Sequence, residues 1–237
     1  MNITEHTSKR FDVELESIRS HVLQMGGLVE SQIKSAIMSL VEGDIDLMNR
    51  VIEDDHRVNA MEVKIDEACS QVIAKRQPTA SDLRLVMMVV KTITDLERIG
   101  DEAEKIARMG KLLLEERGLA IPRYHEVRHA SEIAVEMLRK SLDAFARLDV
   151  LMAAEVVRQD DEVDKEFRAI MRYLITFMME DPRTISTSLE ILFVAKAIER
   201  IGDHAKNISE YVIYMVKGRD VRHVSLEEIE REILKAE

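Results

Sequence analysis

The segment Asp95-Leu-Glu-Arg-Ile-Gly-Asp-Glu-Ala-Glu-Lys-Ile-Ala107 recurs 102 residues later as Ala197-Ile-Glu-Arg-Ile-Gly-Asp-His-Ala-Lys-Asn-Ile-Ser209. Seven of the thirteen aligned residues are identical. Upstream, Asp55-His-Arg-Val-Asn59 aligns with Asp160-Asp-Glu-Val-Asp164 at a spacing of 105 residues, and the difference of three residues falls at a proline-containing loop in each half. Ordered matches along the chain indicate two copies of one structural unit.

The composition of the 237 residues predicts that this unit is helical. Glycine (8) and proline (3) are scarce, tryptophan is absent and aromatic residues make up only 4%, whereas hydrophobic residues reach 46% and charged residues 33%. Side chains that lose little freedom in a helix dominate such a mixture. A β-sandwich, a Rossmann enzyme or a disordered chain would need more turn residues, more aromatics or less apolar content. We therefore expect an all-α protein.

Apolar residues at helical spacing, interrupted by turn residues and prolines, predict six long helices. They span residues 9–41, 44–76, 80–116, 123–147, 149–180 and 185–217. Gly43-Asp44 and Leu148-Asp149 are predicted to form tight corners at the same place in each copy. A short last helix is predicted from Ser225, where Ser-Leu-Glu-Glu fits a capping box.

The repeat and the six helices together predict two tandem three-helix bundles. Residues 1–118 form the first bundle, residues 119–218 the second, and residues 219–237 a C-terminal tail. Helices of this length suit an elongated molecule, because a helix rises about 1.5 Å per residue.

Charge and cysteine content limit the partners of the chain. With a formal net charge of −11, it offers no overall basic surface for nucleic acid. The single cysteine, Cys69, excludes an internal disulfide and fits a reducing compartment. Residues 1–12 lack the apolar core of a signal peptide, and the longest apolar run, Leu85–Val90, is far shorter than the roughly 20 residues that span a bilayer. We expect a soluble, cytoplasmic protein without membrane insertion.

A pair of carboxylates four residues apart lies in each repeated segment: Glu97 and Asp101 in the first, Glu199 and Asp203 in the second. Side chains at this spacing share one face of a helix, within reach of one ligand. A glycine directly precedes each aspartate, although glycine within a helix costs about 1 kcal/mol relative to alanine. The glycines therefore predict close approach by a neighbouring helix.

The second helix of each copy carries its own four-spaced oxygen ligands, Asp55 with Asn59 and Asp160 with Asp164. If the second and third helices pack side by side, each copy assembles four oxygen-bearing side chains. Like charges at this spacing destabilise a helix, so such a cluster favours a compensating cation. Oxygen ligands without cysteine suit hard or borderline ions such as Mg²⁺, Mn²⁺ and iron. A solvated acidic face, neutralised by the arginine that follows each motif glutamate, is the alternative interpretation.

Other patterns that point to metal binding or catalysis are weaker. Glu53-Asp-Asp-His56 and Glu126-Val-Arg-His129 match the Glu-x-x-His spacing of di-iron bundles, but they occupy different places in the two copies. His204 follows Asp203, and we expect it on the surface because its counterpart in the first copy is a glutamate. The sequence holds no glycine-rich phosphate loop, Ser/His/Asp pattern or Cys/His zinc spacing, so no enzymatic activity is predicted.

The segments Glu97-Arg-Ile-Gly-Asp101 and Glu199-Arg-Ile-Gly-Asp203-His-Ala-Lys-Asn207-Ile, within a twofold helical repeat, resemble the PhoU family. The resemblance covers residues from about 9 to 217 and implies PhoU-like bundles that carry metal clusters on their surfaces, with divalent or trivalent ions (Mg, Mn, Fe or Zn). The implied ligands are Glu97, Asp101, Glu199 and Asp203, with Asp55, Asp160 and Asp164 on the facing helices. Asn59 departs from the acidic pattern, which predicts weaker metal binding in the first copy.

The resemblance also implies a function. Members of this family are cytoplasmic and usually dimeric regulators, which link the ABC phosphate importer, through its ATPase subunit PstB, to the sensor histidine kinase PhoR. They hold the phosphate-starvation (Pho) response off when phosphate is plentiful. A non-enzymatic negative regulator of this response and modulator of phosphate uptake is therefore the first hypothesis.

Two other functions stay open at this point. A di-metal carboxylate enzyme or metal-storage bundle would hold its ligands inside the bundle and take up redox-active iron. A structural scaffold would use the acidic pairs only as solubilising charge. The net negative charge and the lack of an anion-binding loop predict that the chain does not bind phosphate directly, which leaves a bound metal as the remaining route to phosphate binding.

Overall fold

The computed structural model describes residues 9–117, 124–222, 224, 225, 227–229 and 231 of the chain. It consists of long helices, as predicted, and the described residues include no strand. In chain order the helices are α1 (Lys9–Glu42), α2 (Ile45–Arg76), α3 (Ala80–Arg117), α4 (Tyr124–Arg147), α5 (Val150–Glu180) and α6 (Ile185–Lys217), with a 3₁₀ turn, η1 (Pro182–Thr184), before α6. Each predicted helix end lies within one residue of the observed end, because turn residues and prolines mark these ends.

The corner after the first helix of each triplet has the same construction in both copies. Gly43 and Leu148 adopt positive φ values of 66° and 54°, which reverse the direction of the chain. The side chains of Asp44 and Asp149 then accept hydrogen bonds from backbone N–H groups in the first turns of α2 and α5. Both predicted corners are confirmed, and their common construction supports the internal repeat.

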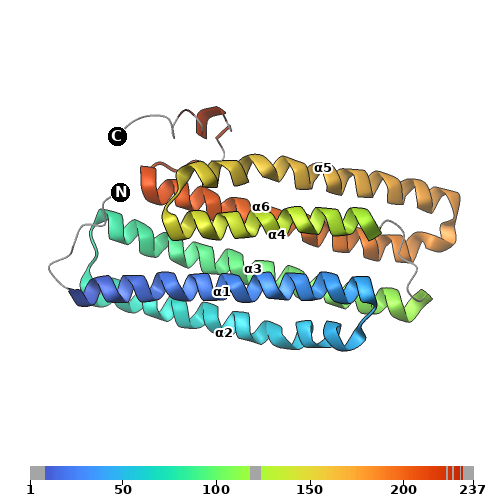
Figure 1. The fold of residues 1–237 in the computed structure, drawn as a ribbon, viewed down its shortest axis with the longest axis horizontal. Helices are drawn as coiled ribbons and strands as arrows, with labels where there is room; N and C mark the ends of the chain where they lie inside the picture. The colour runs from blue at the N-terminus through green and yellow to red at the C-terminus, as the bar shows by residue number, and fades with distance from the viewer. Residues whose placement is uncertain (1–8, 118–123, 223, 226, 230, 232–237) are drawn as a thin grey trace.

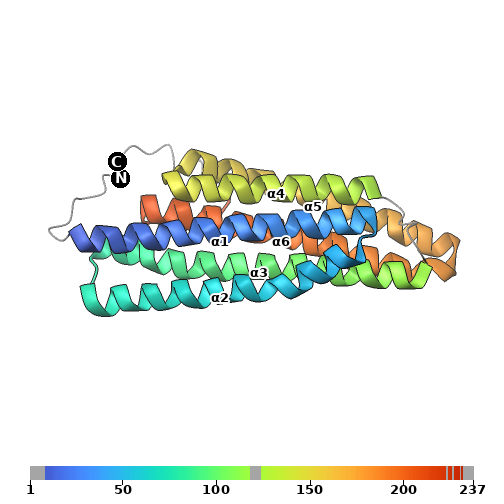
Figure 2. The same cartoon turned by 60° about the horizontal axis from the view of Figure 1, so that its bottom comes forward.

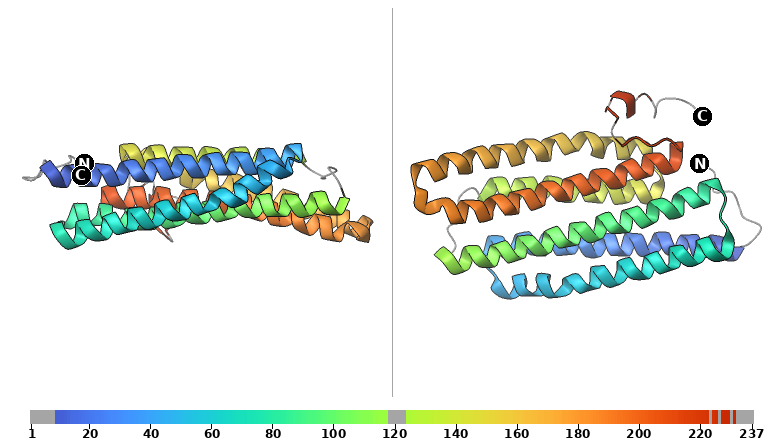
Figure 3. Two further views of the ribbon diagram at one scale, coloured as in Figure 1. Left: turned by 90° about the horizontal axis from the view of Figure 1, so that it is seen from below. Right: turned by 180° about the vertical axis from the view of Figure 1, so that it is seen from behind.

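The six helices run along a common long axis as two triplets, α1–α3 and α4–α6 (Figure 1). At the centre α3 packs against α6, and each of these helices also contacts the other two helices of its own triplet. On one side of this central pair α1 lies beside α4 (Figure 2). A view from below separates α1 and α4 from α3 and α6 in the same way (Figure 3, left). The α3–α6 contact therefore joins the two copies of the repeat.

The predicted apolar stripe is buried along α3 and α6. Leu96 and Ile99 on α3, and Ile198 and Ile201 on α6, are at most 1% exposed. Buried apolar side chains form one cluster that continues from the first triplet into the second. In the part of the chain that the structure describes, no helix is long and apolar enough to cross a membrane.

The bundle boundary falls in residues 118–123, which include Pro122 and lie outside the described residues. The division into 1–118, 119–218 and 219–237 therefore stays a prediction. Within the described part of the tail, Val221 and Ile229 are 2% and 1% exposed, so this segment packs back onto the helices. Residues 227–229 are helical, and Ser225 Oγ accepts a hydrogen bond from the backbone N–H of Glu228 at 3.4 Å, as the capping sequence predicts.

Candidate metal centre

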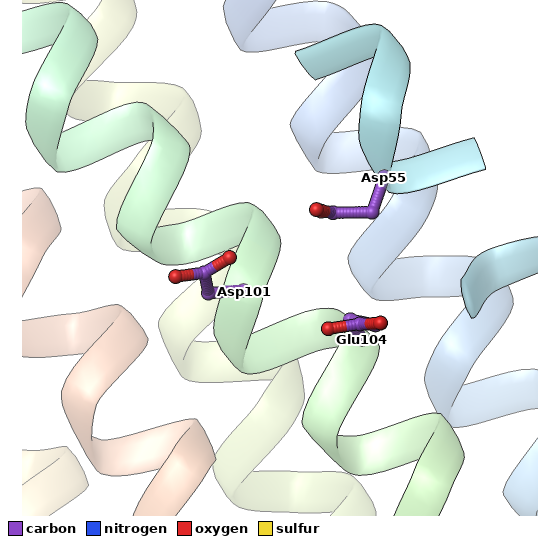
Figure 4. Close-up of side chains that lie close together, drawn as sticks. All are labelled: Asp55, Asp101 and Glu104. Atoms are coloured by element: carbon purple, nitrogen blue, oxygen red, sulfur yellow. The ribbon is translucent and has the colours of Figure 1, made fainter. Parts of the chain in front are cut away.

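Three carboxylates come together where α2 packs against α3 in the first triplet (Figure 4). Asp55 projects from α2, and Asp101 and Glu104 project from α3. One oxygen atom of each carboxylate lies within 4.8 Å of the others. Among the described residues no second group of three histidine, cysteine, aspartate or glutamate side chains meets this distance. We call Asp55, Asp101 and Glu104 the carboxylate cluster.

Two amide side chains hold Asp55 in place. Gln32 Nε2, from α1, donates to Asp55 Oδ1 at 3.0 Å, and Asn59 Nδ2 donates to Asp55 Oδ2 at 3.1 Å. Asp55 itself is only 8% exposed. Because both donors are neutral, they orient the carboxylate without cancelling its charge, as hydrogen-bond donors around metal ligands do.

Two further oxygen atoms beside Asp55 have no partner. Gln32 Oε1 and Asn59 Oδ1 are buried and accept no hydrogen bond within the described structure. Buried acceptors without a partner are unfavourable unless a water or an ion occupies them. With the three carboxylates they bring oxygen atoms from three helices to the surroundings of Asp55, and oxygen is the ligand atom that hard cations prefer. These residues therefore fit a bound cation.

Gly100 makes room for this arrangement. A Cβ atom at Gly100 would lie 3.3 Å from Asp55 Oδ1 and 3.3 Å from Gln32 Oε1, which is closer than ordinary van der Waals contact. At Gly202 the nearest atoms belong to Val163 and lie 3.5 Å away, an ordinary contact distance. The close approach that the paired glycines predict is thus confirmed at Gly100, and the packing is looser at Gly202.

The electrostatics of the cluster also favour a cation. Partial burial, followed by the negative charge of Asp55, raises the pKa of Asp101 above its usual value. Partial burial and then the charge of Asp101 raise the pKa of Glu97. Both raised pKa values mean that the ionised carboxylates are unfavourable here, and a bound cation would reduce the repulsion between their charges. Arg108 pairs with Glu104 at 2.5 Å, and its own side chain is exposed.

Only some of the ligands predicted in the first copy belong to the carboxylate cluster. Asp55 and Asp101 belong to the cluster, whereas Glu97 is half-buried outside it. Glu104 is the member of the cluster that the sequence pattern did not identify. It follows Asp101 by three residues and so shares its helix face. A search for carboxylates repeated in both copies passes over it, because Lys206 stands at the aligned position.

In the second triplet this lysine and another one neutralise the corresponding carboxylates. Lys206, aligned with Glu104, places Nζ 2.7 Å from Asp160 Oδ2. Lys196 donates to both carboxylate oxygens of Glu199, at 2.6 and 2.5 Å. Two of the predicted ligands therefore already have a cationic partner.

The remaining carboxylates of the second triplet differ from each other. Asp164 pairs with Arg168 at 3.5 Å. Asp203 forms no hydrogen bond or ion pair with a described residue, and burial, followed by the charge of Glu199, raises its pKa to about 6. The second copy also has Met137 where the first has Gln32. The geometry thus favours a cation in the first copy, whereas Asn59 predicts weaker binding there, and the order of the two copies stays a prediction.

Neither Glu-x-x-His pair builds a site in the described residues. Glu53 and His56 are exposed, and His56 Nδ1 contacts the backbone carbonyl of Glu53. Glu126 and His129 lie near the start of α4 and belong to no group of three metal-binding side chains. Their spacing is therefore a coincidence of an acidic helical sequence.

His204 is buried, so its predicted surface position is wrong. It is 6% exposed, and its Nδ1 lies 2.7 Å from Asp95 Oδ1 on α3, to which Asn207 Nδ2 also donates at 3.2 Å. Arg200 likewise pairs with Glu102 on α3, at 2.9 Å, rather than with the carboxylate of its own motif. The reason is that the contact between α3 and α6 covers a face that an isolated three-helix bundle would expose.

Comparison with known proteins agrees with this repeat. The PhoU domain matches residues 22–109 and residues 127–212, once in each triplet. This chain belongs to the PhoU family. Each match includes one carboxylate motif, so the family match and the internal repeat describe the same two units.

Relatives in this family match the chain almost from end to end. The phosphate-specific transport system accessory protein PhoU of Escherichia coli (strain K12) is 50% identical over 98% of this chain and 95% of its own length. The PhoU homolog of Pseudomonas aeruginosa is 48% identical over 98% of this chain and 96% of its own length.

Two solved structures agree with the fold. The crystal structure of PhoU from Pseudomonas aeruginosa has a TM-score of 0.85 at 50% identity and covers 88% of this chain and 100% of that one. The phosphate transport system regulatory protein PhoU from Streptococcus pneumoniae has a TM-score of 0.82 at 28% identity and covers 89% and 99%. The PhoU family consists of accessory proteins rather than enzymes, which confirms the prediction that this chain is not an enzyme.

Proposed function

We propose that this chain is a negative regulator of the phosphate-starvation response and a modulator of phosphate uptake. The observation that carries the proposal is the match of both triplets to the PhoU domain, with about half of the residues identical to accessory proteins of phosphate-specific transport systems. The chain acts in the cytoplasm as an adaptor and catalyses no reaction.

The adaptor links the transporter ATPase PstB to the sensor histidine kinase PhoR. When the importer is saturated, it stabilises the kinase in a phosphatase-competent state. An adaptor shifts such an equilibrium only through a difference between its affinities for the two states. Exposed apolar side chains on α5, among them Leu151 (62% exposed) and Met179 (79%), supply contact surface for a partner or for the second copy in a homodimer.

A metal ion at the carboxylate cluster is the second part of this proposal. When bound, the ion neutralises Asp55, Asp101 and Glu104 and so stabilises the contact between α2 and α3. Oxygen ligands favour Mg, Mn or Fe over Zn. The other predicted ligands stay proposals for a larger cluster or a second one, which repression does not require: Glu97, Asp160, Asp164, Glu199 and Asp203.

The position of the cluster favours a regulator over a di-metal enzyme or metal store. A redox bundle holds its ligands inside the helices and uses histidine together with carboxylates. Here Asp101 is exposed, and the cluster contains no histidine. A metal at this place stabilises a surface that a partner can recognise.

The proposal is tested by alkaline phosphatase activity in phosphate-replete cells that lack the gene. The cells receive wild type, a first-copy variant with Asp55→Asn, Asp101→Asn and Glu104→Gln, or a second-copy control with Asp160→Asn and Asp203→Asn. We expect high activity in the deletion strain, repression by wild type and by the control, and loss of repression with the first-copy variant.

Each other outcome removes one part of the proposal. Repression by all three proteins would keep the regulator and exclude a regulatory role for the cluster. Unchanged activity on deletion would exclude the regulatory function itself. Loss of repression with both variants would mean that the two acidic sites contribute together.

A further inference from the structure

A cavity of about 320 Å³ lies where the start of α3, the end of α6 and the tail meet. These two helix ends lie side by side (Figure 1; Figure 3, right). The cavity is lined by residues of α3 between 80 and 91, by residues of α6 between 210 and 214, and by Asp220 and Arg222. Lys91 precedes Asp101 by ten residues, about 15 Å along the helix, so the cavity is separate from the carboxylate cluster. Its volume lies within the range of pockets that bind small molecules.

Two cationic side chains that line this cavity form no ion pair with a carboxylate of the described residues. Neither Arg84 nor Lys91 forms an ion pair with a residue that the structure describes. Arg84 Nε is also buried without a hydrogen-bond acceptor among those residues. The chain has 45 acidic and 34 basic residues, so two cationic side chains without an ion pair in one cavity run against its overall charge.

The C-terminal end of α6 interacts with only one of these two cationic side chains. The guanidinium of Arg84 lies beside Gly218, where a Cβ atom would be 3.1 Å from its Nη1. Gly218 ends α6 in a left-handed conformation, with φ of 70°, and a helix C-terminus attracts cations. This contact engages one edge of the guanidinium, leaves Nε unpaired and does not involve Lys91.

The two carboxylates of the cavity neutralise these cations only in part, although the charge of Lys91 contributes to the lowered pKa of Asp220. Asp220 pairs with Arg222 through two N–O contacts of 2.5 and 3.0 Å, and this hydrogen bonding lowers the pKa of Asp220 to about 2. Glu210 is 8% exposed, and burial raises its pKa to about 7, so it carries only part of its charge near neutral pH. The cavity therefore has an excess of positive charge.

The remaining walls are aromatic and apolar. Tyr211 and Tyr214 of α6 line the cavity together with Leu83 and Met87 of α3. Lys91 Nζ lies 5.6 Å from the centroid of the Tyr211 ring, a cation–π contact that holds the ammonium group at the wall. Leu83 is 39% exposed and Met87 45%, so this apolar surface is open. Flat rings and flexible thioethers pack well against planar organic groups.

The helical repeat does not require the two cations. The spacing of 102 residues aligns Arg84 with Ser186 and Lys91 with Phe193, so α6 forms the same helix with no charge at either position. Ala80, the first residue of α3, also lines the cavity and brings the positive end of that helix to it. These features favour an anionic ligand.

We propose that this cavity binds a phosphorylated small molecule with a planar body, the size of a nucleoside mono- or diphosphate. Its phosphate group lies between Arg84 and Lys91, since guanidinium and ammonium groups both form charge-assisted hydrogen bonds to phosphate. The planar body lies against Tyr214 and Met87. This site reverses the expectation that phosphate groups are bound only through a metal, and it does not depend on the regulatory function proposed above.

The proposal is tested by isothermal titration calorimetry of the purified full-length chain in buffer with EDTA, which removes metal-bridged phosphate. The probes are AMP, ADP, adenosine and inorganic phosphate. We expect AMP or ADP to bind at one site per chain, with weaker binding of adenosine and of inorganic phosphate. Arg84→Gln and Lys91→Gln should each raise the Kd about tenfold or more. Arg172→Gln, an exposed arginine of α5 outside the cavity, is the matched control and should leave the Kd unchanged.

A further variant separates the two parts of the proposal. Tyr214→Leu keeps both cations and should weaken nucleotide binding while leaving the weak binding of inorganic phosphate unchanged. Thermal unfolding of each variant shows whether it folds. Absence of AMP and ADP binding at millimolar concentration, or a Kd that neither glutamine variant changes, would overturn the site. Equal affinity for inorganic phosphate and ADP would contradict the proposal that the cavity binds the planar part of the ligand.

Discussion

Lys206 Nζ lies 2.7 Å from Asp160 Oδ2 in the second triplet, at the position where the first triplet places Glu104 beside Asp55. The internal repeat keeps the helices and their contacts at these positions, but it exchanges a carboxylate for an ammonium group. One half therefore carries three carboxylates with one exposed arginine, Arg108, paired to Glu104, and the other half pairs the equivalent of Asp55 directly with a lysine. The two halves are alike in backbone and different in electrostatics.

Lys206→Glu should create a second cation site. Asp160 then loses its internal cation and faces a new carboxylate near Asp203, as Asp55 faces Glu104 near Asp101. We expect the variant to bind one more Mn²⁺ per chain than wild type in isothermal titration calorimetry. Lys206→Gln, which removes the charge without adding a ligand, is the control and should keep the wild-type stoichiometry. An unchanged stoichiometry in Lys206→Glu would mean that the lysine is not what distinguishes the two halves.

The two motif glycines should respond differently to alanine. At Gly202 the nearest atoms are 3.5 Å from an added Cβ, so Gly202→Ala should raise the free energy of unfolding by about 0.5–1 kcal/mol through helix propensity. At Gly100 the added Cβ meets Asp55 and Gln32 at 3.3 Å, so Gly100→Ala should lower it by about 1 kcal/mol and weaken Mn²⁺ binding. Urea denaturation checks both values. Equal effects at the two positions would contradict the difference in packing.

The buried pair of His204 and Asp95 should contribute strongly to stability. His204→Ala removes one of the side-chain donors to the carboxylate of Asp95, which is 3% exposed, and leaves those of Asn207 and Tyr211. We expect the free energy of unfolding to fall by about 2–4 kcal/mol, since truncating one partner of a buried polar pair is costly. His56→Ala, at an exposed histidine of α2, should change it by less than about 0.5 kcal/mol. A similar small effect at both histidines would show that the pair does not join the triplets.

The helices could be predicted from the sequence almost to the residue, because their determinants are local. Gly43 and Leu148 mark the corners, and aspartates cap the helices that follow. The packing of α3 against α6 could not be predicted in this way. It depends on contacts between residues about 100 positions apart, such as Asp95 with His204, and no local pattern records it. The prediction for His204 failed for this reason.

Only part of the candidate site could be predicted from the sequence, because the prediction relied on residues that occur in both copies of the repeat. Repetition identified Asp55 and Asp101, because both motifs occur twice. It could not identify Glu104, which the second copy replaces by lysine, or Gln32, which the second copy replaces by methionine. A comparison of the two copies identifies the residues that they share, but it cannot identify functional residues that occur in only one of them.

Glu210 should make the stability of the protein fall as the pH rises toward neutrality. Burial raises its pKa from 4.5 to about 7 in the folded protein, against the opposing charges of Lys206 and Arg222. Between these two values the unfolded chain has released this proton and the folded chain still holds it. The unfolded state therefore binds fewer protons in this range, so the free energy of unfolding decreases as the pH rises through it.

Glu210→Gln isolates this effect, because glutamine is uncharged and does not ionise. The other carboxylates with raised pKa values, Asp101 among them, contribute to both proteins and cancel in the difference between wild type and variant. The free energy of unfolding of both proteins is measured by urea denaturation between about pH 4 and pH 8. We expect wild type to lose stability relative to the variant as the pH rises from 4.5 to 7, and the difference to stay constant above pH 7. A difference that is independent of pH would mean that Glu210 keeps an ordinary pKa, and one that shifts toward wild type would mean that Lys206 and Arg222 outweigh its burial.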